Sequence, residues 1–278
     1  MGQNSKIEWT THTFNPWWGC IKVSEACKHC YAESWAKRVG QPVWGPQADR
    51  RFFGDEHWKQ PLRWNALASG AATRPRVFCA SMADVFEDRE GLDLHRDRLW
   101  DLIEATPNLD WLLLTKRPQN VAARVRWGAD WPDNVWLGTT VELQKRADEL
   151  LPFLAAIPAK VRFISAEPLL GPLELDRWLG EAIDWVITGG ESGPKARPAS
   201  PTWFRSLMIQ CMERDVPFHF KQWGDWAPGN AANLPKTKKL RIARAADGTE
   251  MHRVGKKIAG RQLDGNEWDG LPGIAKTR

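Results

Sequence analysis

Three of the five cysteines of this 278-residue chain lie in one stretch near its start, Gly19-Cys20-Ile21-Lys22-Val23-Ser24-Glu25-Ala26-Cys27-Lys28-His29-Cys30-Tyr31-Ala32-Glu33. The spacing C-x6-C-x2-C allows three thiolates to converge on one metal centre. A structural zinc site closes with four protein ligands, whereas iron–sulfur clusters are held by Cys thiolates. A [4Fe-4S] cluster held by three cysteines leaves one iron open, and S-adenosylmethionine (SAM) is the commonest occupant of such an iron. We therefore expect Cys20, Cys27 and Cys30 to bind a [4Fe-4S] cluster, with SAM as a second cofactor.

Zinc is the alternative for this stretch. His12 or His29 could supply a fourth ligand and complete a structural zinc site. His29 lies between Cys27 and Cys30, where its ring would tend to point away from a centre that both cysteines bind. The spacing therefore favours an iron–sulfur cluster.

The composition is that of a globular protein, with 42% hydrophobic and 26% charged residues. No apolar run is long enough to span a membrane, and the first residues lack the apolar core of a secretory signal. Clustered cysteines fit a reducing compartment and a metal site better than a disulfide framework. We expect a cytoplasmic protein without a membrane partner.

The positive charge is concentrated near the C-terminus. Residues 226–278 hold 11 Lys and Arg against 5 Asp and Glu, a net charge of +6, so the remainder of the +5 chain is at −1. A basic tail on a neutral body favours a polyanionic partner or a charged substrate. Nucleic acid or a nucleotide is the candidate, and a solvated surface appendage is the alternative.

Short apolar runs alternate with helical patterns along the chain. The expected strands are 76–81, 111–116, 135–141, 161–166, 184–190 and 217–223, and the expected helices are 31–39, 55–68, 92–105, 118–127, 143–156 and 201–214. Buried strands that alternate with helices indicate βαβ units and a parallel sheet. We expect an α/β fold, a full or partial (β/α) TIM-type barrel over residues 1–224, followed by a small basic C-terminal extension at 225–278. A doubly wound open sheet is the alternative, but no G-x-G-x-x-G follows the first strand.

Polar side chains end every one of the six expected strands. Sites in parallel α/β proteins lie at the carboxyl ends of the strands, so we expect these residues to bind a cofactor or substrate. The strand-end candidates for cofactor binding are Ser81, Asp84, Lys116, Thr140, Glu142, Glu167, Gly189, Gly190 and Glu191.

Three of the expected strand-end groups suggest particular roles. Glycines 189 and 190 let the backbone approach a ligand, because glycine has no side chain to clash. Glu167 and Glu191 could hold the ammonium of SAM or a substrate hydroxyl, or act as the two carboxylates of a metal-independent hydrolase. Cys79 is interpreted either as an inert core cysteine or as a hydrogen-atom donor to the substrate.

The residues also resemble a known family. Asn15-Pro16-x-x-Gly-Cys, Val23-Ser24-x-x-Cys-x-x-Cys-Tyr-Ala-Glu, Thr115-Lys116-Arg117-Pro118, Ser165-Ala166-Glu167-Pro168 and Gly189-Gly190-Glu191-Ser192-Gly193 resemble the phage-associated three-cysteine-motif family. That family is regarded as radical-SAM-like and is distantly similar to the spore photoproduct lyase branch of the radical-SAM superfamily. The resemblance implies that Ser81 and Lys116 contact SAM, with Thr140 nearby. The spacing here departs from the superfamily's C-x3-C-x2-C, and the Gly-Gly-Glu motif comes on a late strand.

These observations together predict a radical-SAM enzyme. The cluster would cleave SAM reductively, and the 5′-deoxyadenosyl radical would abstract hydrogen from a substrate. Cys79, Lys116 and Glu167 are the candidate catalytic residues, and a flavodoxin or ferredoxin would be the reductant protein. A zinc-stabilised nucleic-acid-binding module without radical chemistry is the alternative.

Overall fold

The computed structural model describes residues 2–231, 234–235 and 240–273. The chain forms two compact units, each assembled from separate segments. Unit 1 comprises Met1–Ser24, Ala32–Thr139 and Pro152–Arg162, and unit 2 comprises Glu25–Tyr31, Thr140–Leu151 and Phe163–Arg278. Cys20 therefore belongs to unit 1, whereas Cys27 and Cys30 belong to unit 2.

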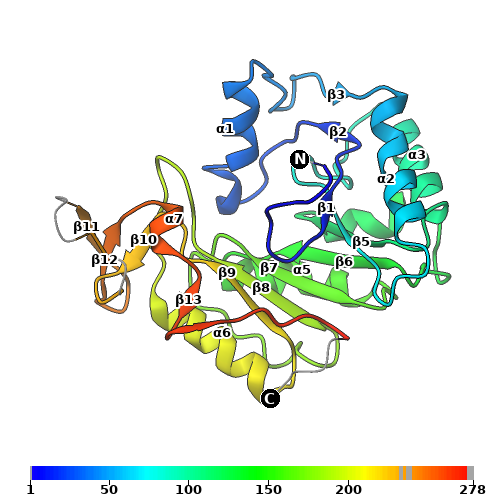
Figure 1. The fold of residues 1–278 in the computed structure, drawn as a ribbon. Coiled ribbons are helices and arrows are strands. Elements are labelled where there is room, and N and C mark those ends of the chain that lie inside the picture. Colours follow the sequence, from blue (N-terminus) through cyan, green and yellow to red (C-terminus); the bar gives the residue numbers. More distant parts are fainter. Residues whose placement is uncertain (1, 232–233, 236–239, 274–278) are drawn as a thin grey trace. The chain divides into compact units, whose positions relative to one another are not determined.

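The helices and strands follow the alternation that the sequence predicts (Figure 1). The strands are β1 (His12–Thr13), β2 (Trp17–Trp18), β3 (Arg51–Phe52), β4 (Arg76–Cys79), β5 (Asp110–Thr115), β6 (Val135–Thr140), β7 (Arg162–Ala166), β8 (Trp185–Gly189), β9 (Phe218–Gln222), β10 (Trp226–Pro228), β11 (Arg241–Arg244), β12 (Glu250–Arg253), β13 (Gln262–Leu263) and β14 (Asn266–Glu267). The helices are η1 (Glu25–Cys27), α1 (Tyr31–Arg38), α2 (Asp55–Leu67), α3 (Asp93–Glu104), η2 (Pro118–Asn120), α4 (Val121–Arg124), α5 (Gln144–Ala155), α6 (Pro201–Glu213) and α7 (Lys256–Ala259).

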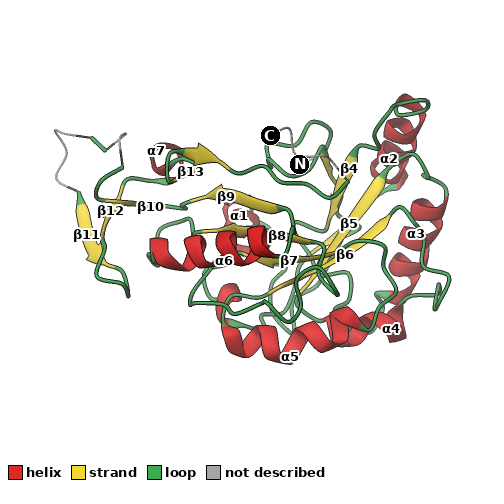
Figure 2. Cartoon of the chain, turned by 90° about the horizontal axis from the view of Figure 1, so that it is seen from below, coloured by secondary structure: helices red, strands yellow, loops and turns green. Residues whose placement is uncertain are grey.

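Seven of the strands form one parallel sheet in the order β1-β4-β5-β6-β7-β8-β9. This order follows the chain without a reversal, whereas a doubly wound sheet reverses at a switch point. The fold is therefore an α/β partial TIM-type barrel, and the prediction of parallel strands in a barrel-like fold is confirmed. Helices connect β4 to β5, β5 to β6, β6 to β7 and β8 to β9, whereas an irregular segment connects β7 to β8. Figure 2 distinguishes these helices from the strands and loops by colour.

The central strands are largely buried because a parallel sheet is covered on both faces. All residues of β6 and of β8 are buried. Trp111 and Trp185 have no exposed surface, and Trp136 is also buried. Core packing thus accounts for the tryptophans that the sequence places beside the apolar runs.

Helix α1 begins at Tyr31, directly after the third cysteine of the motif. Ala32, Trp35, Ala36 and Val39 have the i, i+3, i+4, i+7 spacing that predicts one apolar helix face. The structure buries Ala32 and Ala36, but it leaves Trp35 and Val39 exposed, so the predicted apolar face is only half correct.

Two expected elements differ from the structure. The segment Ile7-Glu8-Trp9-Thr10 suggests a short strand from its sequence, but this prediction is wrong. The N–H of Thr10 bonds to the carbonyl of Ile7 in a turn, and the first sheet strand follows at β1. The helix expected over 118–127 is shorter, since α4 ends at Arg124 and the next residue, Val125, is extended at φ −99° and ψ 152°.

The C-terminal segment of unit 2 forms a small antiparallel sheet in the order β10-β12-β11 and a two-stranded ribbon of β13 and β14. The sequence Ala246-Asp247-Gly248-Thr249 predicts a hairpin turn. The prediction is confirmed, because the N–H of Ala245 bonds to the carbonyl of Thr249 between β11 and β12. The domain boundary after residue 224 stays a prediction. Five basic residues of the extension lie outside the described residues, namely Lys236, Lys238, Lys239, Lys276 and Arg278.

No helix in the described part of the chain is both long enough and apolar enough to cross a membrane.

Candidate metal centre

In unit 1, the carboxylate of Asp84 organises the chain that follows β4 and β5. Its Oδ1 accepts hydrogen bonds from Thr115 Oγ1 at 2.7 Å and from the N–H of Phe86 at 3.0 Å. Its Oδ2 accepts from the N–H of Lys116 at 3.0 Å and from Arg117 Nη1 at 2.8 Å. Asp84 is 5% exposed. Both carboxylate oxygens of Asp84 are thus occupied by hydrogen bonds from this chain. This supports a role for Asp84 in positioning the residues around it rather than in holding SAM.

Arg117 links this carboxylate to the first cysteine of the motif. Its Nη1 lies 3.8 Å from Cys20 Sγ, and its Nη2 donates to the carbonyl of Ile21 at 2.8 Å. Burial, and then the charge of Asp84, raise the pKa of the Cys20 thiol to about 12, while Arg117 acts in the opposite direction. The thiolate is the form that binds metal. Because the raised pKa disfavours the Cys20 thiolate, a bound cation would have to stabilise it.

The backbone of Cys20 is held by a buried ion pair. Arg50 donates two hydrogen bonds to the carboxylate of Glu87, at 2.6 Å and 3.1 Å, and both side chains are 1% exposed. Arg50 also donates to the carbonyls of residues 43, 45 and 48, and the N–H of Gly45 bonds to the carbonyl of Cys20 at 3.0 Å. Gly19 is required beside it, because a Cβ at its φ of +118° would lie 2.3 Å from the carbonyl oxygen of Val43.

Ser81 is held by an asparagine whose importance the sequence did not reveal. Asn15 Nδ2 donates to Ser81 Oγ at 3.1 Å, and Asn15 Oδ1 accepts from the N–H of Met82 at 2.7 Å. Both side chains are buried. The Asn-Pro motif, which the sequence suggests to be only a turn, therefore fixes a predicted SAM contact.

In unit 2, the segment that carries the other two cysteines is a tight turn. The N–H of Lys28 bonds to the carbonyl of Glu25, and the N–H of Cys30 bonds to the carbonyl of Cys27 at 3.3 Å. Glu142 follows β6 and holds this turn, because its Oε1 accepts from the N–H of Ala26 at 3.1 Å. Glu142 has no exposed surface, and its Oε2 is buried without a hydrogen-bond partner. A carboxylate oxygen left in this way is an acceptor that suits a bound cation or donor.

Glu191, after β8, holds the same segment from a second point. Arg197 donates to its Oε2 from Nε at 2.8 Å and to its Oε1 from Nη2 at 2.7 Å, and His29 Nδ1 lies 3.3 Å from Oε2. Arg197 Nη2 also bonds to the carbonyl of Glu25 at 3.1 Å. Burial would raise the pKa of Glu191, but the hydrogen bonds from Arg197 lower it overall. An ionised, fully engaged carboxylate is a structural anchor, and it lacks the raised pKa that the general acid of a hydrolase needs.

Glu167 and Lys221 form the third strand-end pair of unit 2. Lys221 Nζ lies 3.1 Å from Glu167 Oε1 and 3.4 Å from Oε2, and Ser165 Oγ lies 3.5 Å from Oε2. A Cβ on Gly189 would lie 2.8 Å from Glu167 Oε1. Both members of the pair retain some exposure, 14% for Glu167 and 18% for Lys221. Glu167 is a predicted site residue, and together with Lys221 it forms a charged pair at the strand ends of unit 2 that a ligand could reach.

The space beside Gly190 is filled by the chain itself. A Cβ there would lie 1.9 Å from the carbonyl oxygen of Trp223, and its N–H bonds to the carbonyl of Gln222 at 2.9 Å. Gly224, at φ +79°, makes the reciprocal approach to the carbonyl of Glu191. The Gly-Gly pair is thus explained by close packing of two backbone segments, and its ligand-binding role stays a prediction.

The remaining candidates lie deeper. Cys79 ends β4 with no exposed surface, and burial raises the pKa of its thiol. This burial is what the interpretation as an inert core cysteine predicts. Thr140 is 1% exposed at the end of β6, and Lys116 is half-buried beside Asp84.

Sequence reasoning overlooked the roles of Arg117, Arg197 and Asn15. Arg117 belongs to the Thr-Lys-Arg-Pro motif and directly follows a predicted strand. This position could have indicated a role at the site. Arg197 lies in an irregular loop, and only the folded chain reveals its contact with Glu191.

The donor chemistry of the three cysteines fits an iron–sulfur cluster. All five cysteines of the chain are free of disulfides, and each part of the motif is fixed by charged groups at strand ends. No group of three or more His, Cys, Asp or Glu side chains in the described residues is arranged to hold a metal ion. The spacing of the motif is therefore the evidence that the three cysteines converge on one centre.

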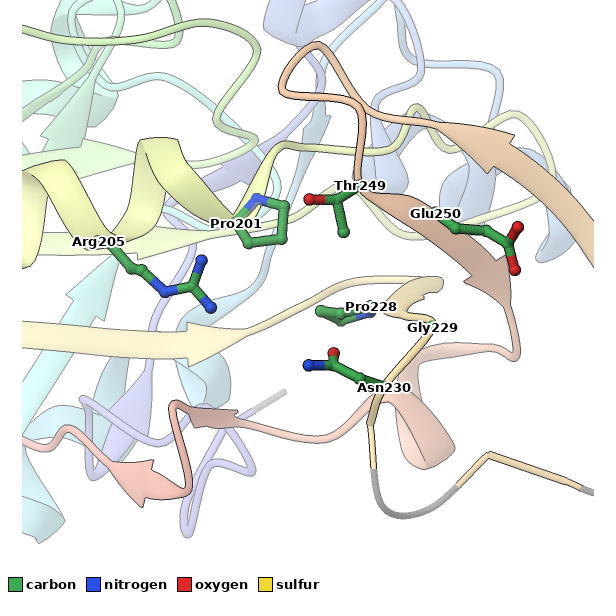
Figure 3. A pocket seen from close by; sticks show the side chains of 7 residues that line it. All are labelled: Pro201, Arg205, Pro228, Gly229, Asn230, Thr249 and Glu250. Carbon is green, nitrogen blue, oxygen red and sulfur yellow. The ribbon is translucent and has the colours of Figure 1, made fainter.

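A separate pocket lies in unit 2 between the start of α6 and the strands β10 and β12 (Figure 3). Its volume is about 410 Å³, and it is lined by Pro201, Arg205, Pro228, Gly229, Asn230, Thr249 and Glu250. None of these residues is among the predicted site residues.

The comparisons with known proteins identify the family to which the chain belongs. A family model described as "Protein of unknown function (DUF5131)" matches residues 4–272, so the chain belongs to this family. No curated protein sequence matches the chain.

Solved structures of spore photoproduct lyase are similar to the chain at low sequence identity. One, complexed with dinucleoside spore photoproduct, has 13% identity and a TM-score of 0.48. Another, a variant with bound AdoMet and dinucleoside spore photoproduct, has 12% identity and a TM-score of 0.47. In both cases the match covers 91% of this chain and 71% of the other.

Proposed function

We propose that the protein is a radical-SAM enzyme in which Cys20, Cys27 and Cys30 hold a [4Fe-4S] cluster. The observation that carries the proposal is the C-x6-C-x2-C motif, whose cysteines form no disulfide and whose flanking backbone is bound by strand-end charges of a parallel sheet. Arg117 binds the carbonyl next to Cys20, and Glu142 binds the turn before Cys27. Anchors of this kind orient metal ligands and are as much a part of a metal site as the ligands themselves.

The bound cluster and SAM would supply reductive cleavage of SAM and a 5′-deoxyadenosyl radical for hydrogen abstraction. The chain would bind and orient SAM through Ser81, Lys116 and Thr140, the positions that the family resemblance implies. Glu142 Oε2 is a buried acceptor suited to the ammonium group of SAM. Glu167 and Lys221, partly exposed, would contact SAM or substrate.

Anaerobic purification with iron and sulfide analysis tests this function, followed by EPR of the reduced protein with and without SAM. We expect about four irons per chain and a spectrum that SAM perturbs. Cys20→Ser should abolish the spectrum, whereas Cys211→Ala, a cysteine of α6 outside the motif, should preserve it. Full iron content in the Cys20 variant would refute the assignment.

A zinc site is the second candidate, and one contact favours it. His29 Nδ1 lies 3.3 Å from the carboxylate of Glu191, and metal-bound histidines usually place their second ring nitrogen on such a group. The zinc candidate predicts a colourless, air-stable protein with one zinc per chain, so the same metal analysis separates the two candidates.

We further propose single-stranded nucleic acid as the substrate class, supported by a surface of unit 1 that we call the aromatic surface. It comprises Trp18, Trp35, Arg51 and Phe52. Phe52 is 44% exposed and Trp35 is 36% exposed. Arg51 lies 4.6 Å from the ring centre of Trp18 and forms no ion pair within the described residues. Exposed rings beside unpaired arginine suit stacked bases and phosphates.

Fluorescence anisotropy with labelled single-stranded oligothymidylate tests this surface. We expect Phe52→Ala to weaken binding about tenfold, the effect of losing one base-stacking ring. The matched control is Leu94→Ala, which removes an exposed apolar side chain that is not aromatic. Equal affinities of the two variants, or affinity that does not fall with salt, would contradict the proposal.

The electron donor is proposed to be a flavodoxin or ferredoxin, because the cluster needs a low-potential one-electron reductant. A cytoplasmic location is proposed because five cysteines without a disulfide fit a reducing compartment.

A further inference from the structure

Opposite charges meet beside the sulfur of Cys20. The guanidinium of Arg117 places Nη1 3.8 Å from Cys20 Sγ and 2.8 Å from Asp84 Oδ2. The side chains of Arg117 and Asp84 are only 8% and 7% exposed. Charges with so little access to water act on their neighbours with weak screening.

Other charges near this sulfur are already balanced. Glu87 contributes a negative charge, but Arg50 binds both of its carboxylate oxygens. Arg117 and Asp84 are therefore the charged side chains whose replacement would change the field at Cys20 most directly.

We propose that Arg117 and Asp84 set the reduction potential of the cluster through Cys20, Arg117 raising it and Asp84 lowering it. This inference rests on the proposed function. When the cluster accepts one electron from a low-potential donor, its net charge becomes more negative by one, and no proton is transferred. A cation beside a cluster ligand stabilises that reduced form, and an anion destabilises it.

The contacts assign the two residues different secondary roles. Arg117 also clamps the loop, because its Nη2 binds the carbonyl of Ile21. Asp84 holds Thr115 Oγ1 and the N–H of Lys116 in addition to Arg117. The variants must therefore distinguish the effect of each residue's charge from the effect of its hydrogen bonds to the loop.

EPR-monitored redox titration of the reconstituted protein tests the inference. Arg117→Met should lower the midpoint potential, and Asp84→Asn, which keeps the side-chain shape, should raise it. We expect each change to alter the reduction equilibrium constant at least tenfold, which is 59 mV for a one-electron couple. The double variant should return toward the wild-type potential. Arg117→Lys keeps the charge and should keep the potential even where iron content falls.

The surface variant Arg126→Gln, in an ion pair with Asp101 and Glu104, is the control and should leave the potential unchanged. A purely structural role would lower iron content in both single variants without shifting their potentials in opposite directions, and that outcome overturns the inference alone. Should a single variant fail to fold, the double variant and Arg117→Lys decide the result. A wild-type protein that cannot hold iron would overturn the inference and the proposed function together.

Discussion

Arg197 binds both carboxylate oxygens of Glu191, at 2.7 Å and 2.8 Å, and extends to the carbonyl of Glu25 at 3.1 Å. This pair joins the end of β8 to the turn that carries Cys27 and Cys30. Unit 1 repeats the arrangement with other residues, since Arg117 binds Asp84 and the carbonyl of Ile21. In both units an arginine converts a strand-end carboxylate into an anchor for a cysteine segment.

Arg197→Met should therefore loosen the turn that carries two of the three proposed ligands. Glu191 would be left 5% exposed without its main partner. Breaking a buried pair costs about 3–5 kcal/mol, and because Arg197 is 29% exposed we expect about 2 kcal/mol. Urea unfolding of the metal-free protein measures this loss, and iron content after reconstitution should fall by more than half.

Arg205→Met is the matched control for this change. Arg205 binds Asp264 in a similar two-pronged geometry, but the side chains are 42% and 43% exposed. Exposed pairs contribute up to about 1 kcal/mol. If the two variants lost equal stability and iron, the anchoring role of Arg197 would be wrong.

Gly19→Ala should displace the segment that carries Cys20. The added Cβ would lie 2.3 Å from the carbonyl oxygen of Val43 and 2.6 Å from Arg50 Cδ, at a φ of +118°. Gly45 has the same φ with nothing within 4 Å of its Cβ position, so Gly45→Ala isolates the cost of the backbone angle from that of the clash. We expect the Gly19 variant to lose most of its iron and the Gly45 variant to keep it, measured by reconstitution and iron analysis. Equal retention would show that the close contact has no effect on the site.

Glu87→Ala should be among the most destabilising single changes in unit 1. It leaves the guanidinium of Arg50 buried without its counter-ion, and loss of one partner of a buried pair costs about 3–5 kcal/mol. Chemical denaturation measures the change. Glu56→Ala, which removes a carboxylate that is 72% exposed, should leave the stability close to that of the wild type. A similar loss in both variants would contradict the buried-pair argument.

The sequence predicted the sheet strands closely because each is a continuous apolar run bounded by polar residues. The run 161–166 is β7 at Arg162–Ala166, and the helix expected over 201–214 is α6 at Pro201–Glu213. Both boundaries depend on local residues, which sequence patterns contain. The short β1 and α4 were not anticipated correctly, because so few residues carry little periodic pattern.

The apolar and polar patterns that predicted the strands do not reveal the functions of individual strand-end residues. Position after a strand indicated that Asp84 and Glu191 belong to a functional edge, but their partners depend on the folded chain. Asp84 meets Arg117 across 33 residues of sequence, and Glu142 meets Ala26 across 116. Gly190 was interpreted from its missing side chain as a place for a ligand, whereas the structure fills that space with the backbone of Trp223.

Asp247 should stabilise unit 2 in a pH-dependent way because it caps α6 from the hairpin of β11 and β12. Its Oδ2 accepts from Thr202 Oγ1 at 2.9 Å and from the N–H of Thr202 at 3.3 Å. Slight burial would raise the pKa of Asp247, but hydrogen bonds from Thr249 and Thr202 lower it below its ordinary 3.8. A depressed folded-state pKa means that the contribution is complete above pH 3.8 and is lost as the pH falls through the folded-state value.

Asp247→Ala should therefore cost about 1 kcal/mol near neutral pH, as loss of a helix cap does, and the difference from wild type should shrink below pH 3.8. Thermal unfolding at several pH values measures this dependence. Asp133→Ala, at an exposed side chain 3.8 Å from Lys160, serves as the control. A difference that stayed constant as the pH fell would exclude the ionised carboxylate as the source of the stabilisation.

Glu142→Gln should separate the anchoring of the cysteine turn from the binding of SAM. The amide oxygen can still accept from the N–H of Ala26, so iron content should be retained. The second carboxylate oxygen, buried without a partner, becomes an NH₂ that cannot accept a bond from an ammonium group. Because a hydrogen bond to a charged group contributes about 1.5–3 kcal/mol, we expect SAM affinity to fall at least tenfold in equilibrium dialysis with the reconstituted protein. Glu149→Gln, on the exposed side of α5, should bind SAM as the wild type does. Loss of iron together with SAM in the Glu142 variant would instead assign this carboxylate to support of the turn alone.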